Sequence, residues 1–400
     1  MMTEVTISGL GARGEGIAEV AGQKVFVPFT LPGEVADVDV TGDHARLERL
    51  ISASEDRIEP FCPHFGACGG CQLQHLGFET YRTFKRGLVE TALRRVGIDT
   101  PVGALIDAQG AGRRRATLHA RREGSGYMQA RSHEVHDLDR CPILVPSLAK
   151  ATDICRALQQ AIGECDVSFT ATRTGLDVAI RAEKARAKPE RLAPITQQFR
   201  IGRLSLNGEM LLLNQVPAVA MGKAMVDVPV GSFLQATEEA ETVLAGLVLE
   251  PLAKAKVKSV ADLFCGIGPF TLRMAEIAKV YAADSDKPGI AALQKAVRNT
   301  QGLKAVTAQV RDLFREPLTQ FELGGYDAIV FDPPRAGAEA QAKELAKGKV
   351  KTIIGVSCEP KTFARDAAIL IAGGYRLESV VPVDQFAWST HVELVGVFRR

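Results

Sequence analysis

The chain has 400 residues, of which 46% are hydrophobic, and its formal net charge is only +2 at pH 7. No 18-residue apolar run is present, which argues against a membrane-spanning helix, and residues 1–16 lack the basic and apolar regions of an export signal. We therefore expect a cytoplasmic protein of two or three domains with no membrane partner, whose 8 cysteines serve as thiols, ligands or nucleophiles instead of disulfides.

Charge is distributed unevenly along the chain. Residues 1–61 contain 5 Lys or Arg and 11 Asp or Glu, a balance of −6, whereas residues 81–131 contain 11 and 4, a balance of +7. A concentrated positive segment in a nearly neutral chain suits a polyanion such as nucleic acid, although a merely solvated face is the alternative.

Short alternating segments occupy the N-terminus, at residues 4–8, 16–20, 24–28 and 34–40, and the pair Pro32-Gly33 interrupts them. This pattern predicts a small β-barrel. Barrels of this kind often bind RNA, but the local excess of acidic residues argues against a broad electrostatic contact.

Three cysteines follow closely on one another, and the next one in the chain lies far away. They are Cys62, Cys68 and Cys71 in the stretch FCPHFGACGGCQLQ, and Cys141 in DRCPIL. Gly69 and Gly70 allow the backbone to curl, so that three thiolates can surround one centre. The pattern predicts metal binding. Zinc is one candidate, but its sites usually show two paired Cys-x-x-Cys units, and three close cysteines plus a distant fourth are more typical of an iron–sulfur cluster.

The middle of the chain predicts a mixed α+β domain. Residues 81–97 have the pattern of an amphipathic helix, and residues 113–131 that of a hairpin turning at 123–126. Strand patterns continue at 167–172, 176–180 and 203–206, and residues 186–191 are predicted to form a surface loop. We expect a largely antiparallel sheet here.

From about residue 210 strands and helices alternate. Strands are predicted at 259–263, 280–284, 305–309, 327–331, 350–356, 373–381 and 393–398, with helices ending near 278 and 299. This alternation predicts the α/β class and a doubly wound, Rossmann-like sheet.

A nucleotide-like pocket is predicted at the ends of these strands. Gly266 and Gly268 permit a tight turn and close approach of a ligand to the backbone, and Asp284 follows at the distance of a ribose-binding carboxylate. A nicotinamide dehydrogenase would have a longer glycine motif, whereas S-adenosyl-L-methionine (SAM), which has no pyrophosphate, needs only the shorter turn. Asp312 is placed to meet the adenine side, and Asp332 ends the fourth strand; helix capping is the alternative role for each aspartate.

Cys358 follows the predicted strand 350–356, in the stretch VSCEP. A lone cysteine after a strand is usually a small core residue, but strand ends are also where ligands gather in open α/β sheets. The glycine turn upstream and Glu393 downstream favour a nucleophile at this position.

Taken together, these motifs resemble the SAM-dependent RNA uracil-C5 methyltransferases, which modify tRNA or 23S ribosomal RNA. The motifs are Cys62-x5-Cys68-Gly-Gly-Cys71 with Cys141, Gly231-Ser-Phe233-Leu-Gln235, Asp262-Leu-Phe-Cys-Gly-Ile-Gly268, Asp332-Pro-Pro-Arg335, Val356-Ser-Cys358 and His391-Val-Glu393. The resemblance implies an OB-like barrel of the TRAM type over residues 1–58, a central domain with a [4Fe-4S] cluster and an RNA-binding surface over 59–209, and a methyltransferase domain over 210–400.

The resemblance also implies the roles of individual residues. Cys358 should be the nucleophile and Glu393 the base, and the donor pocket should be lined by Gln235, Phe264, Asp284, Asp312 and Asp332. We expect an RNA partner, 23S rRNA in preference to tRNA, and a monomer. Glu359 and Pro269 depart from the family pattern, because asparagine is common at both places; a carboxylate beside Cys358 would raise the thiol pKa.

Two other functions fit parts of the sequence. One is a SAM-dependent methyltransferase that modifies another RNA or protein group without using Cys358. The other is a non-catalytic RNA-binding iron–sulfur protein. They differ from the first interpretation in whether a covalent bond to RNA forms at Cys358.

Overall fold

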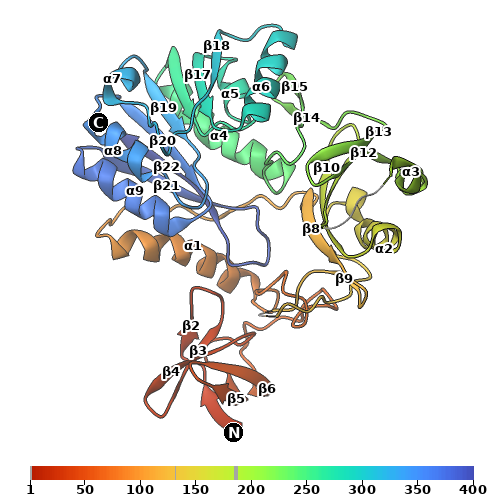
Figure 1. Cartoon of the computed structure of the whole chain (residues 1–400). Coiled ribbons are helices and arrows are strands. Elements are labelled where there is room, and N and C mark those ends of the chain that lie inside the picture. The colour runs from red at the N-terminus through yellow and green to blue at the C-terminus, as the bar shows by residue number, and fades with distance from the viewer. Residues whose placement is uncertain (1, 131, 184–187) are drawn as a thin grey trace.

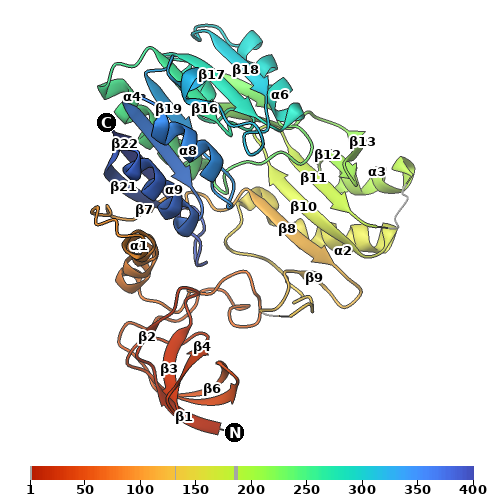
Figure 2. The ribbon, with the colours of Figure 1, turned by 60° about the vertical axis from the view of Figure 1, so that its left-hand side comes forward.

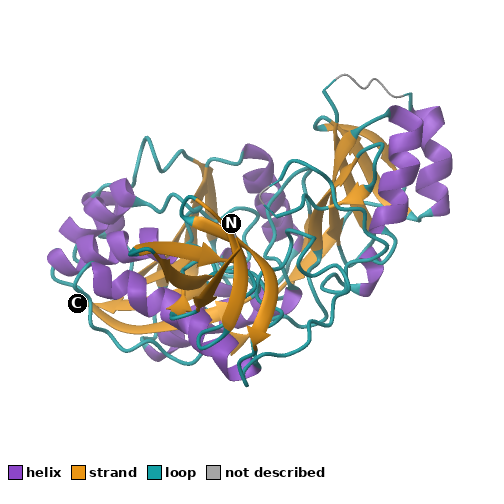
Figure 3. Ribbon diagram, turned by 90° about the horizontal axis from the view of Figure 1, so that it is seen from below, coloured by secondary structure: helices purple, strands orange, loops and turns teal. Residues whose placement is uncertain are grey.

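The computed structural model describes residues 2–130, 132–183 and 188–400. Figure 1 shows a small β-barrel at the N-terminus, a sheet with two helices in the middle of the chain, and a larger helix-covered sheet at the C-terminus. Figure 3, seen from the barrel end, shows the barrel in front of the other two parts.

The barrel is formed by six strands in the order β1-β5-β6-β4-β3-β2. Their bounds are β1 Met2–Thr6, β2 Gly9–Leu10, β3 Gly16–Val20, β4 Gln23–Val27, β5 Val35–Thr41 and β6 His44–Ser52. Alternate residues such as Val25, Val27 and Val38 are fully buried and form its core. The predicted barrel is confirmed, but β6 was not predicted because charged residues interrupt its apolar pattern.

Helix α1 (Phe78–Arg95) lies close to the predicted helix and packs against α9 (Pro360–Ala372) and β21 (Arg376–Asp384) of the C-terminal sheet. Its buried face carries an unexpected residue. Lys85 is fully buried, and its Nζ donates hydrogen bonds to Asp384 Oδ1 (2.8 Å) and to the carbonyl oxygens of Phe386 and His391. The amphipathic pattern predicted for residues 81–97 leads us to expect basic residues on the solvent side, opposite the apolar face, and that expectation is wrong at Lys85.

We expect Lys85→Met to lower the free energy of unfolding by about 3–5 kcal/mol, because it leaves the buried Asp384 carboxylate without its cation. Equilibrium denaturation measures this change. Arg86→Met is the matched control, because Arg86 pairs with Glu90 on the exposed side of the same helix and should contribute less than about 1 kcal/mol. Equal losses in the two variants would contradict the prediction.

The central sheet has the order β13-β12-β11-β10-β8-β9, and its neighbours are antiparallel except for β11 and β12. The strands are β8 Arg115–Ala120, β9 Ser125–Gly126, β10 Cys165–Ala171, β11 Leu176–Arg181, β12 Ile201–Leu206 and β13 Glu209–Leu213. The 3-10 helix Pro146–Leu148, α2 (Ala151–Ile162) and α3 (Pro189–Gln198) accompany it. The predicted loop 186–191 is wrong from Pro189 onward, where proline starts α3; residues 186 and 187 lie outside the described residues.

The C-terminal sheet has eight strands in the order β18-β17-β16-β19-β20-β22-β21-β7. They are β16 Ser259–Leu263, β17 Lys279–Asp284, β18 Val306–Val310, β19 Ala328–Phe331, β20 Thr352–Ser357, β21, β22 Glu393–Arg399 and β7 Ile106–Asp107. The first five strands run parallel, and β22 is antiparallel to β20 and β21. The hairpin of β14 (Ala218–Met221) and β15 (Ala224–Asp227) packs on α6 (Lys287–Asn299).

Helices cover both faces of this sheet (Figure 2). They are α4 Glu238–Lys254, α5 Thr271–Met274, α6 Lys287–Asn299, α7 Gln320–Leu323, α8 Glu339–Lys347 and α9. The predicted doubly wound architecture is therefore confirmed. The strand order reverses between β16 and β19, and ligands of such sheets bind beyond the strand ends at this reversal.

The predicted domain boundaries stay a prediction. Helix α1 and strand β7 belong by sequence to the predicted central region, yet α1 shares a core with the C-terminal helices and β7 pairs with β21. Among the described helices, none combines the length and hydropathy needed to cross a membrane.

Candidate active site

The loop after β16 forms an open turn at the point where the strand order reverses. Gly266 and Gly268 have φ values of +52° and +95°, which favour glycine. A Cβ on Gly268 would collide with Leu293, whereas a Cβ on Gly266 would meet no protein atom within 4 Å. The turn therefore faces open space at Gly266, where a ligand can approach the backbone.

Two of the predicted carboxylates organise the loops around this turn. Asp284, at the end of β17, accepts hydrogen bonds from the backbone N–H of Gly266 (2.8 Å) and of Asp286 (2.8 Å). Asp312 accepts from the N–H of Phe314 (3.0 Å), and the Phe314 ring packs against Phe264 with centroids 5.4 Å apart. These contacts join Asp284 to the glycine turn and Asp312, through Phe314, to Phe264. Asp284 is not the cap of the helix that follows it, whose N-cap is Asp286.

Asp262 was not assigned a role from the sequence, although it begins the glycine motif. It is fully buried at the end of β16; one carboxylate oxygen accepts a hydrogen bond from the Thr271 hydroxyl, and Oδ1 has no partner among the described residues. Burial, together with the charges of Asp332 and Asp284, raises the pKa of Asp262 to about 7. An unpaired buried acceptor is costly, so this atom fits a donor group on a ligand in the turn.

Cys358, Asp332 and Glu393 come together at the ends of β20, β19 and β22. Burial raises the pKa of the half-buried Cys358 thiol to about 11; the charges of Glu393 and Asp332 add to this effect, and Arg335 opposes it. Burial also raises the pKa of Glu393 to about 7, and burial and the charge of Glu393 raise that of Asp332 well above its usual range. The two predicted catalytic residues are therefore electrostatic neighbours of each other and of the Asp332 loop.

Of the two departures from the family pattern, Glu359 has a local structural explanation; the contact of Pro269 is made by its backbone carbonyl and does not explain the proline. Glu359 is the N-cap of α9, where its carboxylate accepts from the Lys361 N–H (3.3 Å), and the carboxylates acting on Cys358 are those of Glu393 and Asp332. The carbonyl of Pro269 accepts from Arg273 Nη1 (2.6 Å), which fixes the end of the glycine turn.

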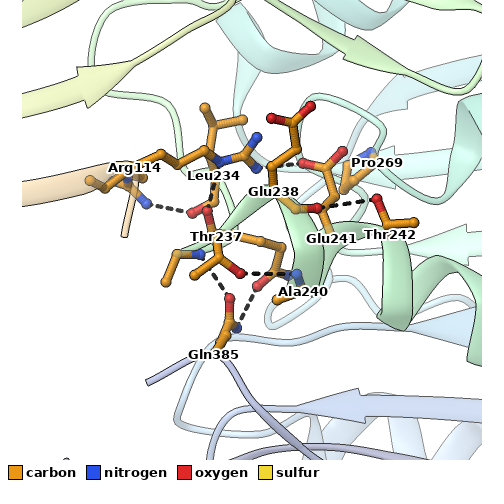
Figure 4. A network of polar contacts seen from close by, with 12 residues as sticks. Arg114, Leu234, Thr237, Glu238, Ala240, Glu241, Thr242, Pro269 and Gln385 are labelled. Carbon is orange, nitrogen blue, oxygen red and sulfur yellow. Dashed lines mark hydrogen bonds and ion pairs between the residues drawn. The ribbon is translucent and has the colours of Figure 1, made fainter. Parts of the chain in front are cut away.

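Gln235, in the segment before α4, is buried and is joined to Glu393 through Gln385, which Figure 4 shows in a network of polar contacts. Its Oε1 accepts a hydrogen bond from Gln385 Nε2 (2.7 Å), and the same Nε2 donates to Glu393 Oε2 (2.6 Å). Gln385 was not predicted, because nothing in its sequence surroundings distinguishes it from a loop residue.

Cys358 opens into a groove of about 1720 Å³ that lies between the barrel, α1 and the cysteine loop. The groove is larger than the roughly 300–1,000 Å³ of a typical small-molecule pocket. Cationic side chains from three parts of the chain line it together with the candidate nucleophile: Arg13, Lys24 and Arg46 of the barrel, Arg95 of α1 and Lys361 of α9. The remaining basic residues of segment 81–131 are not all available to a ligand, since Lys85 and Arg114 are buried in ion pairs.

The four predicted metal ligands line one small cavity. Cys62, Cys68, Cys71 and Cys141 share it with Tyr127, and all four are free thiols. Gly70 N–H donates to Cys68 Sγ (3.4 Å). Among the described residues no group of three or more His, Cys, Asp or Glu side chains is arranged so that it could hold a metal ion, so the cluster stays a prediction.

Comparison with known proteins agrees with this geometry. Residues 203–400 match the tRNA (uracil-5-)-methyltransferase family, and residues 2–46 match the TRAM domain. An RNA methyltransferase of Brucella suis is 45% identical over 99% of this chain and 98% of its own length. The 23S rRNA (uracil(1939)-C(5))-methyltransferase RlmD of Pectobacterium atrosepticum is 32% identical over 98% of this chain and 93% of its own.

A solved structure has the same fold over the whole chain. The Pyrococcus abyssi tRNA (uracil-54, C5)-methyltransferase, determined with S-adenosyl-L-homocysteine, superposes with a TM-score of 0.76 at 22% identity and covers 100% of both chains. Together with the full-length relatives, these matches show that the chain belongs to the SAM-dependent RNA uracil-5 methyltransferase family.

Proposed function

We propose that this enzyme methylates C5 of a uridine in 23S rRNA by way of a covalent bond between Cys358 and C6 of the uracil. The proposal is carried by the convergence of Cys358, Asp332 and Glu393 beside the glycine turn, at the edge of a groove too large for a small molecule alone. The RlmD relative, which covers nearly the whole chain, supports 23S rRNA as the substrate.

Cys358 supplies the nucleophile that uracil C5 lacks. Its thiolate adds to C6, and the electron pair of the C5–C6 double bond moves onto C5 and the O4 carbonyl as an enolate. The SAM sulfonium bound at the Gly266 turn would offer the methyl group to C5. The free thiol has a raised pKa, so Arg335, which favours the thiolate, is the cation placed to assist its formation.

Glu393 completes the reaction by taking the C5 proton. The C–H electron pair then restores the C5–C6 double bond, and the C6–S pair leaves with the sulfur of Cys358. A carboxylate with a pKa near 7 is well matched to this task at neutral pH. Gln235, Phe264, Gly266, Gly268, Asp284, Asp312 and Asp332 are proposed to line the donor pocket.

The substrate uridine has to leave its stack to reach Cys358. Turning a base out costs a few kcal/mol, which phosphate contacts to the cations of the groove can offset. Incubating the protein with SAM and either a 23S rRNA transcript or tRNA, and then mapping 5-methyluridine, tests the proposal. We expect product in 23S rRNA only; product in tRNA alone would overturn the choice of substrate.

We further propose that Cys62, Cys68, Cys71 and Cys141 hold a [4Fe-4S] cluster. Support comes from four free thiols around one cavity and from a backbone N–H directed at one sulfur, an arrangement that tunes sulfur ligands. The cluster would join the loop around Cys62 to the segment around Cys141. The cytoplasmic location and the monomeric state remain predictions.

We expect anaerobically purified protein to contain about four iron and four sulfide per chain, as the cluster formula requires, with broad visible absorption. Cys141→Ala should lose both, because it removes one of four ligands. Cys155→Ala is the matched control, since Cys155 is buried in the central core away from the cavity. Stoichiometric zinc without iron or sulfide would contradict the assignment.

A further inference from the structure

Gln385 is fully buried at the start of the connection between β21 and β22, and its amide makes three hydrogen bonds. Its Oε1 accepts from the backbone N–H of Ala236 (2.7 Å), and its Nε2 donates to Gln235 Oε1 (2.7 Å) and Glu393 Oε2 (2.6 Å). Because a backbone N–H can only donate, it fixes which end of the amide is oxygen, and both hydrogens of Nε2 then have an acceptor.

The segment that Gln385 contacts belongs to a buried, charge-paired frame. Arg114 donates from its backbone N–H to Ala236 O (2.8 Å) and from Nε to Gln235 O (3.0 Å). Its Nη2 pairs with Glu241 Oε2 (2.6 Å), and Figure 4 shows Arg114 and Glu241 on one side of this frame with Gln385 on the other. Gln385 therefore ties the Glu393 carboxylate to the central sheet and to α4.

The residues around Gln385 in the chain are held by α1 and by the cysteine loop. The neighbouring Asp384 accepts hydrogen bonds from Lys85 Nζ and from the Tyr81 hydroxyl, both on α1. Further along the connection, the carbonyl of Trp388 accepts from the N–H groups of Gln72 (2.8 Å) and Leu73 (3.1 Å), next to Cys71. The connection that ends at Glu393 is thus fixed at three places, and Gln385 makes its direct contact with the carboxylate.

We propose that Gln385 is a positioning residue that holds the Glu393 carboxylate where it can take the C5 proton, so that the covalent bond to Cys358 can break. This rests on the proposed function. Glu393 lies at the start of a strand, and Gln385 is its one described side-chain hydrogen-bond donor. Donation to the ionised carboxylate also lowers the pKa of Glu393 against the effect of burial.

Removing the Gln385 amide donor should affect release of the methylated RNA much more than methyl transfer to C5. Gln385→Met and Gln385→Leu both keep the approximate volume and remove the donor, without adding a charge beside Glu393. For both, we expect multiple-turnover methylation to fall roughly 100-fold, the scale of a misplaced catalytic group. Methyl transfer within the first turnover should change only a few-fold, and a methylated protein–RNA adduct should accumulate on denaturing gels.

The controls separate this role from a structural one. Gln301→Met makes the same change at an exposed position and should behave as the wild type. SAM binding and the melting temperature show whether each Gln385 variant is folded. The inference would be overturned by a folded Gln385 variant that releases product at the wild-type rate, or by one that loses methyl transfer and product release equally and forms no adduct. If the wild-type protein formed no adduct with 5-fluorouridine RNA, the proposed function itself would be overturned.

Discussion

Replacing Cys358 with alanine is expected to abolish methyl transfer, with a loss of about 10⁴-fold or more, the scale on which enzymes lose activity with their nucleophile. The expected loss follows from the weak nucleophilicity of uracil C5, which only the addition of sulfur to C6 overcomes. The measurement is incorporation of labelled methyl groups from SAM into 23S rRNA, together with gel detection of the covalent complex.

The matched control is Cys155→Ala, which removes a thiol from the core of the central sheet. It should retain turnover, whereas Cys358→Ala should still bind SAM and RNA, because Cys358 lies at the edge of the groove and outside the glycine turn. Full turnover by Cys358→Ala would favour the alternative methyltransferase that uses no thiol nucleophile.

Replacing Glu393 with glutamine is expected to stop the reaction at a different point. Cys358 can still add to C6 and C5 can still be methylated, but no base removes the C5 proton. The variant should therefore accumulate a stable complex of protein and methylated RNA, with multiple turnover reduced about 10²–10⁴-fold, the usual contribution of a general base.

A pH series on the wild-type protein tests the same residue. Burial places the pKa of Glu393 at about 7, and only its ionised form can accept a proton. Release of methylated RNA from adduct formed beforehand should therefore slow as the pH falls below about 7. Adduct formation is measured separately, because the raised pKa of Cys358 makes the supply of thiolate fall with pH as well. A Glu393→Gln variant that turned over at the wild-type rate, or that formed no adduct, would contradict this role.

The parts of the fold set by local pattern were predictable from the sequence. Seven of the eight strands of the C-terminal sheet lie within a few residues of their predicted bounds, because most are short apolar runs flanked by polar turns. The two-residue strand β7 was not predicted. The turn at Gly266 and Gly268 was also predictable, because a Gly-x-Gly pair after a strand indicates a tight turn. Both residues have the positive φ values that favour glycine. The joint role of Cys358 and Glu393 was implied by the resemblance of their motifs to a known family.

Other features depend on contacts between distant segments. The sequence predicts that Lys85 is a surface lysine of an amphipathic helix. Its burial is explained by its pairing with Asp384, which lies 299 residues away in the chain. Gln385 hydrogen-bonds to Gln235, 150 residues away in the chain, and no periodicity of the sequence predicts such a contact. Glu359 illustrates the converse, because sequence adjacency to Cys358 suggested an electrostatic effect, whereas the structure gives it a helix N-cap.

The most direct test of the covalent mechanism is intact mass spectrometry of the protein after incubation with SAM and a 23S rRNA fragment containing 5-fluorouridine at the methylated position. Fluorine at C5 cannot be removed as a proton, so the reaction should stop with one protein, one RNA and one methyl group covalently joined. Peptide mapping should place the RNA on Cys358. Methylated RNA that remains separate from the protein, or attachment to another residue, would contradict the mechanism.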